Sequence, residues 1–141
     1  MDAVRKITDD LAIAGQVTSE QLQQMAYEGY RSVLNLRSPC ENASFSQEQQ
    51  QVVASGMRYA YLLIDVEAMT TEVAAKVLQQ IDELPKPILV YGSSAVVAAA
   101  MVLMHIAMRQ GESLQQAFQR AERFGLFEIK SSETLTSSVT S

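Results

Sequence analysis

Short apolar stretches alternate along the chain with longer segments whose apolar residues recur at helical spacing. The short stretches predict β-strands over residues 11–15, 32–36, 58–64 and 88–91. The longer segments predict helices that begin near residues 18 and 46 and that cover residues 71–84, 95–108 and 113–124. Strands that alternate with helices are typical of a parallel sheet. The sequence therefore predicts an α/β fold, with a mostly parallel central sheet of four to five strands and helices on both faces.

Capping and stop signals mark several of these boundaries. Thr18 is followed three residues later by Gln21, which fits a capping box at a helix start. Ser46 is a second cap signal, and Gly56 stands where the helix that follows it would stop. Residues 88–91 are apolar throughout, which predicts a central parallel strand buried on both faces.

The length of 141 residues and an apolar content of 48% are typical of one globular domain. We expect this single domain to cover residues 1–129. Ser and Thr dominate residues 130–141, which carry too little apolar surface to offset the entropy of ordering. This segment is therefore predicted to be a disordered tail.

Charge and residue counts exclude several classes of protein. Eleven basic against sixteen acidic residues give a net charge of −5, so nucleic acid is not an expected partner. Cys40 is the only cysteine and His105 the only histidine, which excludes an internal disulfide and a Cys/His zinc site. The longest apolar run, residues 95–108, is shorter than the roughly twenty residues of a membrane span. We expect no membrane association, no cofactor, no metal and, without a signal peptide, a cytoplasmic location.

The predicted topology places any ligand site at the carboxyl ends of the strands. Those ends are followed by residues 37–42, 65–69 and 92–96. The turn from Gly92 into the helix over 95–108 would point several backbone N–H groups the same way, which suits an anion. The alternative is that Gly and Ser here only permit a tight turn. His105, among apolar neighbours, is predicted to be a core residue bonded to a backbone group.

Four stretches of the chain resemble a bacterial phosphatase-like family labelled beta-lactamase hydrolase-like, a branch of the cysteine-dependent protein tyrosine phosphatase fold. They are residues 7–21 (ITDDLAIAGQVTSEQ), 29–41 (GYRSVLNLRSPCE), 56–66 and 87–101. The resemblance spans about residues 7–127 and implies that fold. A rhodanese is the competing interpretation, and the Gly15-Gln16 opening argues against it.

The chain departs from this family where the chemistry would lie. Active members carry His-Cys at the end of this strand, and here those positions are Tyr91 and Gly92. Their loop Arg corresponds to Val97 or Ala98. The resemblance therefore implies a degenerate phosphate loop without its nucleophile or its phosphate clamp. The loop positions are Tyr91, Gly92, Ser93, Ser94, Ala95, Val96 and Val97. If the loop geometry is kept, Gly92→Cys should give a thiol with a lowered pKa. The alternative is that Gly92 holds a positive φ angle, in which case Gly92→Cys would destabilise the protein.

Five polar residues are candidates for the rim of such a pocket: Arg37, Cys40, Glu41, Asp65 and Glu67. Arg37 could contact an anion or form an ion pair with Glu41. Cys40 could be a displaced nucleophile, although a plain thiol is the commoner case. Asp65 matches by position a loop that supplies a general acid in related phosphatases, and the alternative is a solvated carboxylate.

Three functions follow from these residues. The first is an inactive phosphatase-like domain, a pseudophosphatase that binds a protein partner or a small anion. The second is an active hydrolase that uses Ser93, Ser94 or Cys40 as nucleophile. The third is a homo-oligomeric scaffold whose old pocket is filled by Val96 and Val97.

Overall fold

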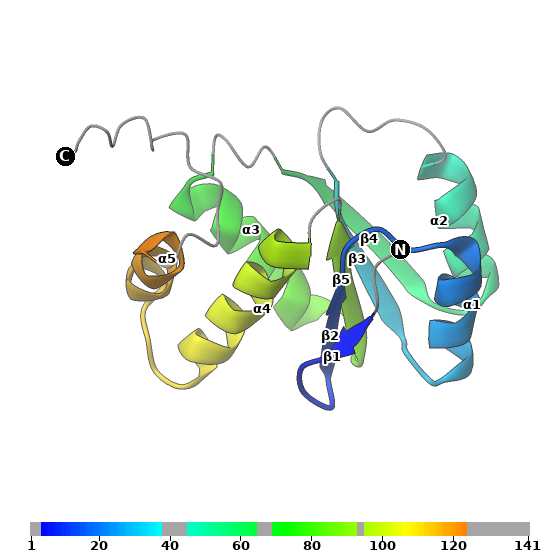
Figure 1. Ribbon diagram of the computed structural model, residues 1–141, viewed down its shortest axis with the longest axis horizontal. Coiled ribbons are helices and arrows are strands. Elements are labelled where there is room, and N and C mark those ends of the chain that lie inside the picture. The colour runs from blue at the N-terminus through cyan, green and yellow to red at the C-terminus, as the bar shows by residue number, and fades with distance from the viewer. Residues whose placement is uncertain (1–3, 38–44, 65–68, 93–94, 124–141) are drawn as a thin grey trace.

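The computed structural model describes residues 4–37, 45–64, 69–92 and 95–123. Within these residues five strands form one sheet in the order β1-β2-β5-β3-β4 (Figure 1). Only β1 runs antiparallel to its neighbour, and the other pairs are parallel. The predicted mostly parallel sheet is therefore confirmed. The strands are β1 (Arg5–Lys6), β2 (Leu11–Ala14), β3 (Ser32–Arg37), β4 (Arg58–Leu63) and β5 (Ile88–Gly92).

Helices cover both faces of this sheet, as predicted. They form one group on each face of the sheet (Figure 1). The first pair is α1 (Ser19–Tyr27) and α2 (Phe45–Ala54). The second group is α3 (Thr71–Glu83), α4 (Ala95–Arg109) and α5 (Leu114–Arg123). None of the helices in the described ranges is long and apolar enough to cross a membrane.

The strand β5 lies at the centre of the sheet, between β2 and β3, and all five of its residues are buried. Successive side chains point to opposite faces of a strand. Ile88 and Val90 pack into the apolar core beneath α3, α4 and α5, whereas Leu89 and Tyr91 belong to the smaller cluster beneath α1 and α2. The apolar run of residues 88–91 thus has the central position that the sequence predicts.

Most of the predicted helix boundaries agree with the structure. The Thr18 hydroxyl accepts from the Gln21 N–H at 3.1 Å, and the Gln21 side chain accepts from the Thr18 N–H at 2.9 Å. This is the expected capping box. The expected cap at Ser46 is wrong, because α2 already begins at Phe45. The edge strand β1 was not predicted, since two residues are too short to show an alternating pattern.

Candidate functional site

The carboxyl ends of β3, β4 and β5 meet at one edge of the sheet, as predicted. Arg37, which ends β3, pairs in register with Leu63 of β4, and Leu36 pairs with Gly92 of β5. The structure describes the backbone of Arg37 but not its side chain. The other rim candidates and two of the loop positions lie outside the described residues: Cys40, Glu41, Asp65, Glu67, Ser93 and Ser94.

Gly92 has no room for a side chain. A Cβ atom built on it would lie 2.5 Å from the carbonyl oxygen of Leu36 and 3.3 Å from that residue's carbonyl carbon. Real Cβ atoms essentially never approach within 3.0 Å of a heavy atom, and the obstacle is strand backbone rather than a flexible side chain. The alternative in which Gly92→Cys destabilises the protein is therefore favoured, although its expected cause, a positive φ angle, is wrong. The cause is the close approach of β3, since the φ angle of Gly92 lies outside the left-handed region.

The two positions that the resemblance predicts to match a loop Arg are both buried in the apolar core. Val97 and Ala98 lie in the first turn of α4 and pack with the residues beneath α3, α4 and α5. Val96 is half-exposed instead. Val97 therefore contributes to the core, whereas half of the Val96 surface remains exposed.

A partly buried polar cluster lies beside these strand ends, on the face covered by α1 and α2. Glu48 of α2 uses one carboxylate oxygen, Oε2, to accept from three side chains. The Tyr59 hydroxyl donates to it at 3.2 Å and the Asn35 amide at 3.3 Å. The Tyr91 hydroxyl donates to the same oxygen in a very short contact. Asn35 also donates to the Tyr59 hydroxyl at 3.0 Å.

Strand alternation and register bring the four residues together. Asn35 of β3 pairs directly with Tyr91 of β5, the strand at the centre of the sheet. Tyr59 stands on the other neighbour, β4, opposite Val33, on the same face of the sheet. Glu48 reaches them from the first turn of α2, where the positive end of the helix dipole favours a carboxylate. We refer to Asn35, Glu48, Tyr59 and Tyr91 as the Glu48 cluster.

Burial and the carboxylate keep both phenols of the Glu48 cluster protonated. Burial raises the pKa of Tyr59 to about 12, helped by the negative charge of Glu48, while the hydrogen bond from Asn35 opposes the shift. Burial and then the charge of Glu48 raise the pKa of Tyr91 well above its usual range. Each phenol therefore serves as a donor to Glu48 and does not ionise at neutral pH.

This arrangement opposes the binding of an anion. The Glu48 carboxylate accepts a hydrogen bond from Tyr91, the residue just before Gly92. The side chains that donate to this carboxylate are all neutral. A phosphate near Gly92 would meet the charge of Glu48 across a partly buried medium, where repulsion is strong. No group of three or more potential metal ligands occurs among the described residues.

The sequence analysis named Tyr91 but missed Asn35, Glu48 and Tyr59. A signal was present for Asn35, which is the one amide within the apolar stretch 32–36. Glu48 lies two residues after the predicted cap at Ser46, and nothing in its local sequence marks it as a site residue. Its role depends on where α2 crosses the sheet, which local sequence does not determine.

The predicted environment of His105 is partly correct. The side chain is buried in α4, as expected, but its Nε2 atom lies 2.8 Å from Asp82 Oδ1 of α3. Its partner is thus a carboxylate rather than a backbone group. The pair lies on the opposite face of the sheet from the Glu48 cluster.

Solved structures with this arrangement of strands and helices identify the fold. A protein from Shewanella putrefaciens CN-32, described as a candidate phosphatase of the DUF442 family, superposes with a TM-score of 0.68. It shares 20% sequence identity, over 84% of this chain and 77% of the other. The active form of Tk-PTP gives a TM-score of 0.66 at 17% identity, covering 94% and 91% of the two chains. This chain has a protein tyrosine phosphatase-like fold.

A third structure agrees with this assignment. A candidate phosphatase from Neisseria meningitidis Z2491 gives a TM-score of 0.63 at 19% identity, over 87% of this chain and 89% of the other. No family model and no curated protein matches the sequence. The phosphatase-like fold expected from the resemblance is therefore confirmed, and the chain is a phosphatase-like domain in its architecture.

Proposed function

We propose that the protein is a catalytically inactive phosphatase-like domain that binds a protein partner at the strand-end edge. The observation that carries the inactivity is the backbone contact at Gly92. A thiolate nucleophile at this position would need a Cβ atom, and that atom would lie only 2.5 Å from the carbonyl oxygen of Leu36. Loss of a covalent nucleophile can cost on the order of 10⁶ in rate.

The choice of a protein rather than a small anion rests on charge and on surface chemistry. The positions that correspond to the phosphate-clamping Arg hold Val97 and Ala98, both packed into the core. Glu48 adds a negative charge in contact with Tyr91, the residue before Gly92. At the same edge Leu63, the last residue of β4, is 59% exposed. An apolar side chain at the rim suits the core of a protein–protein contact better than it suits phosphate.

Turnover of an aryl phosphate tests the inactivity. We expect the full chain to show no hydrolysis above buffer, and Ser93→Ala, Ser94→Ala and Cys40→Ser to change nothing. Turnover that disappears in one of these three variants would identify a replacement nucleophile and overturn the proposal.

Calorimetric titration with inorganic phosphate tests the choice of ligand. The missing bidentate contact is worth roughly 1.5–3 kcal/mol, or about ten- to a hundred-fold in affinity. We therefore expect phosphate to bind no tighter than about millimolar. Micromolar binding would favour an anion-binding module instead, and Arg37→Gln would then show whether that side chain supplies the cation.

A further inference from the structure

The Glu48 carboxylate carries a negative charge that its hydrogen-bond partners do not neutralise. Its Oε2 atom accepts from the Asn35 amide and from the Tyr59 and Tyr91 hydroxyls, which are all neutral donors. Among the residues that the structure describes, no hydrogen bond and no ion pair reaches the other oxygen, Oε1. A carboxylate offers about four acceptor positions over its two oxygens. Glu48 therefore keeps acceptor capacity for a cation.

The carboxylate is both accessible and held in place. Glu48 and Tyr59 are partly exposed, whereas Asn35 and Tyr91 are buried. The three donors and the position of Glu48 in the first turn of α2 fix the side chain before any ligand arrives. A ligand that binds Glu48 therefore bears little of the entropic cost of ordering it.

Two exposed side chains of β4 adjoin the Glu48 cluster. Tyr59, Tyr61 and Leu63 alternate along the strand, so they lie on the same face of the sheet. The ring centroids of Tyr59 and Tyr61 are 6.4 Å apart, and Tyr61 pairs in register with Asn35. Tyr61 is 46% exposed and Leu63 is 59% exposed. The face of a tyrosine ring attracts a cation, and the planar guanidinium of Arg also stacks on it.

We propose that the Glu48 cluster is a cation site that takes an Arg side chain of the protein partner. This inference rests on the proposed function and names the chemistry of its partner. The guanidinium donates to Glu48 Oε1 and lies against the ring of Tyr61, while an apolar residue beside the Arg packs on Leu63. The net charge of −5 favours the approach of a basic partner.

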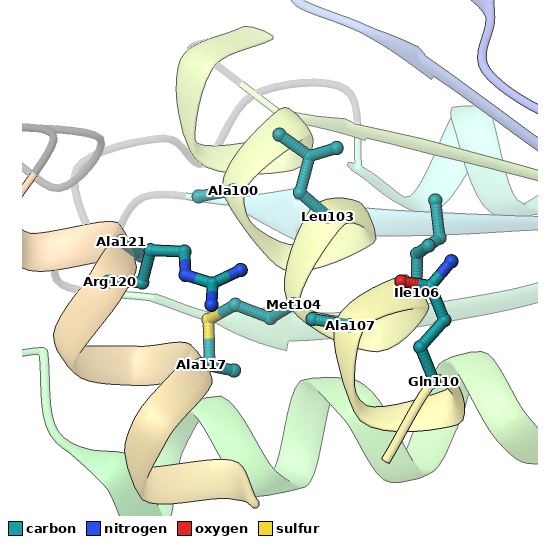
Figure 2. Close-up of a pocket in the computed structure, with 9 residues that line it drawn as sticks. All are labelled: Ala100, Leu103, Met104, Ile106, Ala107, Gln110, Ala117, Arg120 and Ala121. Atoms are coloured by element: carbon teal, nitrogen blue, oxygen red, sulfur yellow. The ribbon is translucent and has the colours of Figure 1, made fainter. Parts of the chain in front are cut away.

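The hollow between α4 and α5 does not offer these groups (Figure 2). It has a volume of about 260 Å³ and an apolar lining apart from Gln110 and Arg120. The guanidinium of Arg120 is already paired with Glu112. Neither a carboxylate nor a tyrosine occurs among the described residues that line this hollow, so it provides no comparable site for a cation.

An NMR titration of the full chain with the dipeptide acetyl-Arg-Leu-amide tests the proposal. The matched probe is acetyl-citrulline-Leu-amide, which keeps the shape of Arg and lacks its charge. We expect the Arg probe to shift the signals of the Asn35 side-chain amide and of the Tyr61 N–H. The citrulline probe should bind about ten-fold more weakly or worse, because it cannot form a charge-assisted hydrogen bond.

Three variants assign the binding to these side chains. Glu48→Gln should weaken binding of the Arg probe by about ten- to a hundred-fold, since the amide keeps an acceptor oxygen for the phenols and loses the charge. Glu20→Gln is the matched control, because Glu20 is an exposed carboxylate in the first turn of α1, and it should leave binding nearly unchanged. Tyr61→Ala leaves the Glu48 cluster intact and should also weaken binding. The NMR spectra show whether each variant is folded.

Several outcomes would overturn the proposal. They are equal binding of the two probes, equal binding of the Arg probe to the wild type and to Glu48→Gln, and a wild-type chain that does not respond to millimolar Arg probe. Binding that appears only in Arg37→Gln would overturn it as well, because the chain's own Arg37 would then be the cation held at Glu48. None of these results bears on turnover of an aryl phosphate, so this proposal and the proposed inactivity fail separately.

Discussion

The two faces of the sheet differ in chemistry. The face beneath α3, α4 and α5 packs a large, mostly apolar core. The face beneath α1 and α2 has a smaller apolar cluster and, at the strand ends, the Glu48 cluster. Each strand supplies both faces through its alternating side chains. The side-chain hydrogen bonds that connect a helix to β3, β4 and β5 next to Gly92 thus lie on the face beneath α1 and α2.

Neighbouring residues of β3 show the contrast within one strand. Leu34 is fully buried among apolar side chains on one face, while Asn35 binds Glu48 and Tyr59 on the other. Packing volume should control stability on the first face, and hydrogen bonding on the second. Four substitutions or titrations test this difference.

On the apolar face, Leu34→Ala should give the largest loss. Removing a fully buried Leu side chain costs about 2–5 kcal/mol of unfolding free energy, because a cavity remains. Urea denaturation measures the loss, and Val53→Ala on the exposed side of α2 is the control, with an expected change below about 0.5 kcal/mol. A loss at Leu34 as small as the control's would mean that this core relaxes without a cavity.

On the polar face, Glu48→Ala should cost about 1–3 kcal/mol, because the Asn35 amide and two phenols lose their common acceptor. Gln49→Ala, an exposed neighbour on the same helix, is the matched control and should have little effect. Tyr91→Phe should suppress part of the cost of Glu48→Ala in a double-mutant cycle. Additive effects in that cycle would contradict the contact between Tyr91 and Glu48.

Alkaline pH should reduce the part of the folding stability that the phenols of the Glu48 cluster contribute. The pKa of Tyr59 is about 12 in the folded chain and 10.0 in a free side chain, so between these values the unfolded chain loses a proton that the folded chain keeps. The stabilisation is complete below pH 10 and falls as the pH rises toward 12. The double variant Tyr59→Phe, Tyr91→Phe should show a shallower fall in denaturation experiments. Tyr27→Phe, at a side chain that is 87% exposed, should fall like the wild type. If stability fell equally with pH in the wild type and in both variants, the buried phenols would not be the cause of the alkaline loss.

The smallest effect should come from the contact between His105 and Asp82. Asp82 is largely exposed to solvent, so the pair is screened. We expect Asp82→Asn to cost less than about 1 kcal/mol at neutral pH in thermal or urea unfolding. A cost as large as that of Glu48→Ala would show that the two faces do not differ in the way described.

The fold could be predicted from the sequence, because the residues that determine each strand and helix lie close together in the chain. The strand of residues 88–91 is apolar on both faces because it lies at the centre of the sheet, and the Thr18–Gln21 capping box marks the start of α1 within four residues of chain. The short strand β1 could not be predicted from the sequence, since its two residues form a strand only through pairing with β2.

The site could be predicted from the sequence only in part, because it depends on contacts between segments that are distant in the chain. The absence of a nucleophile at Gly92 could be inferred from the resemblance alone. The steric reason could not, since the Leu36 carbonyl that crowds Gly92 belongs to another strand. Likewise Glu48 and Tyr91 are 43 residues apart in sequence and meet only when α2 packs on the sheet.

The behaviour of Gly92→Cys tests the central claim most directly, because it asks whether this strand end can hold a nucleophile. A thermal melt is combined with the rate of thiol alkylation against pH, in a Cys40→Ser background that leaves one thiol. We predict a lower melting temperature than that of the background protein, because the new Cβ must displace the Leu36 carbonyl, and a thiol without a lowered pKa near the carboxylate of Glu48. A protein that melts like its background and whose new thiol ionises well below the usual pKa would show an intact phosphate cradle, and would contradict the account.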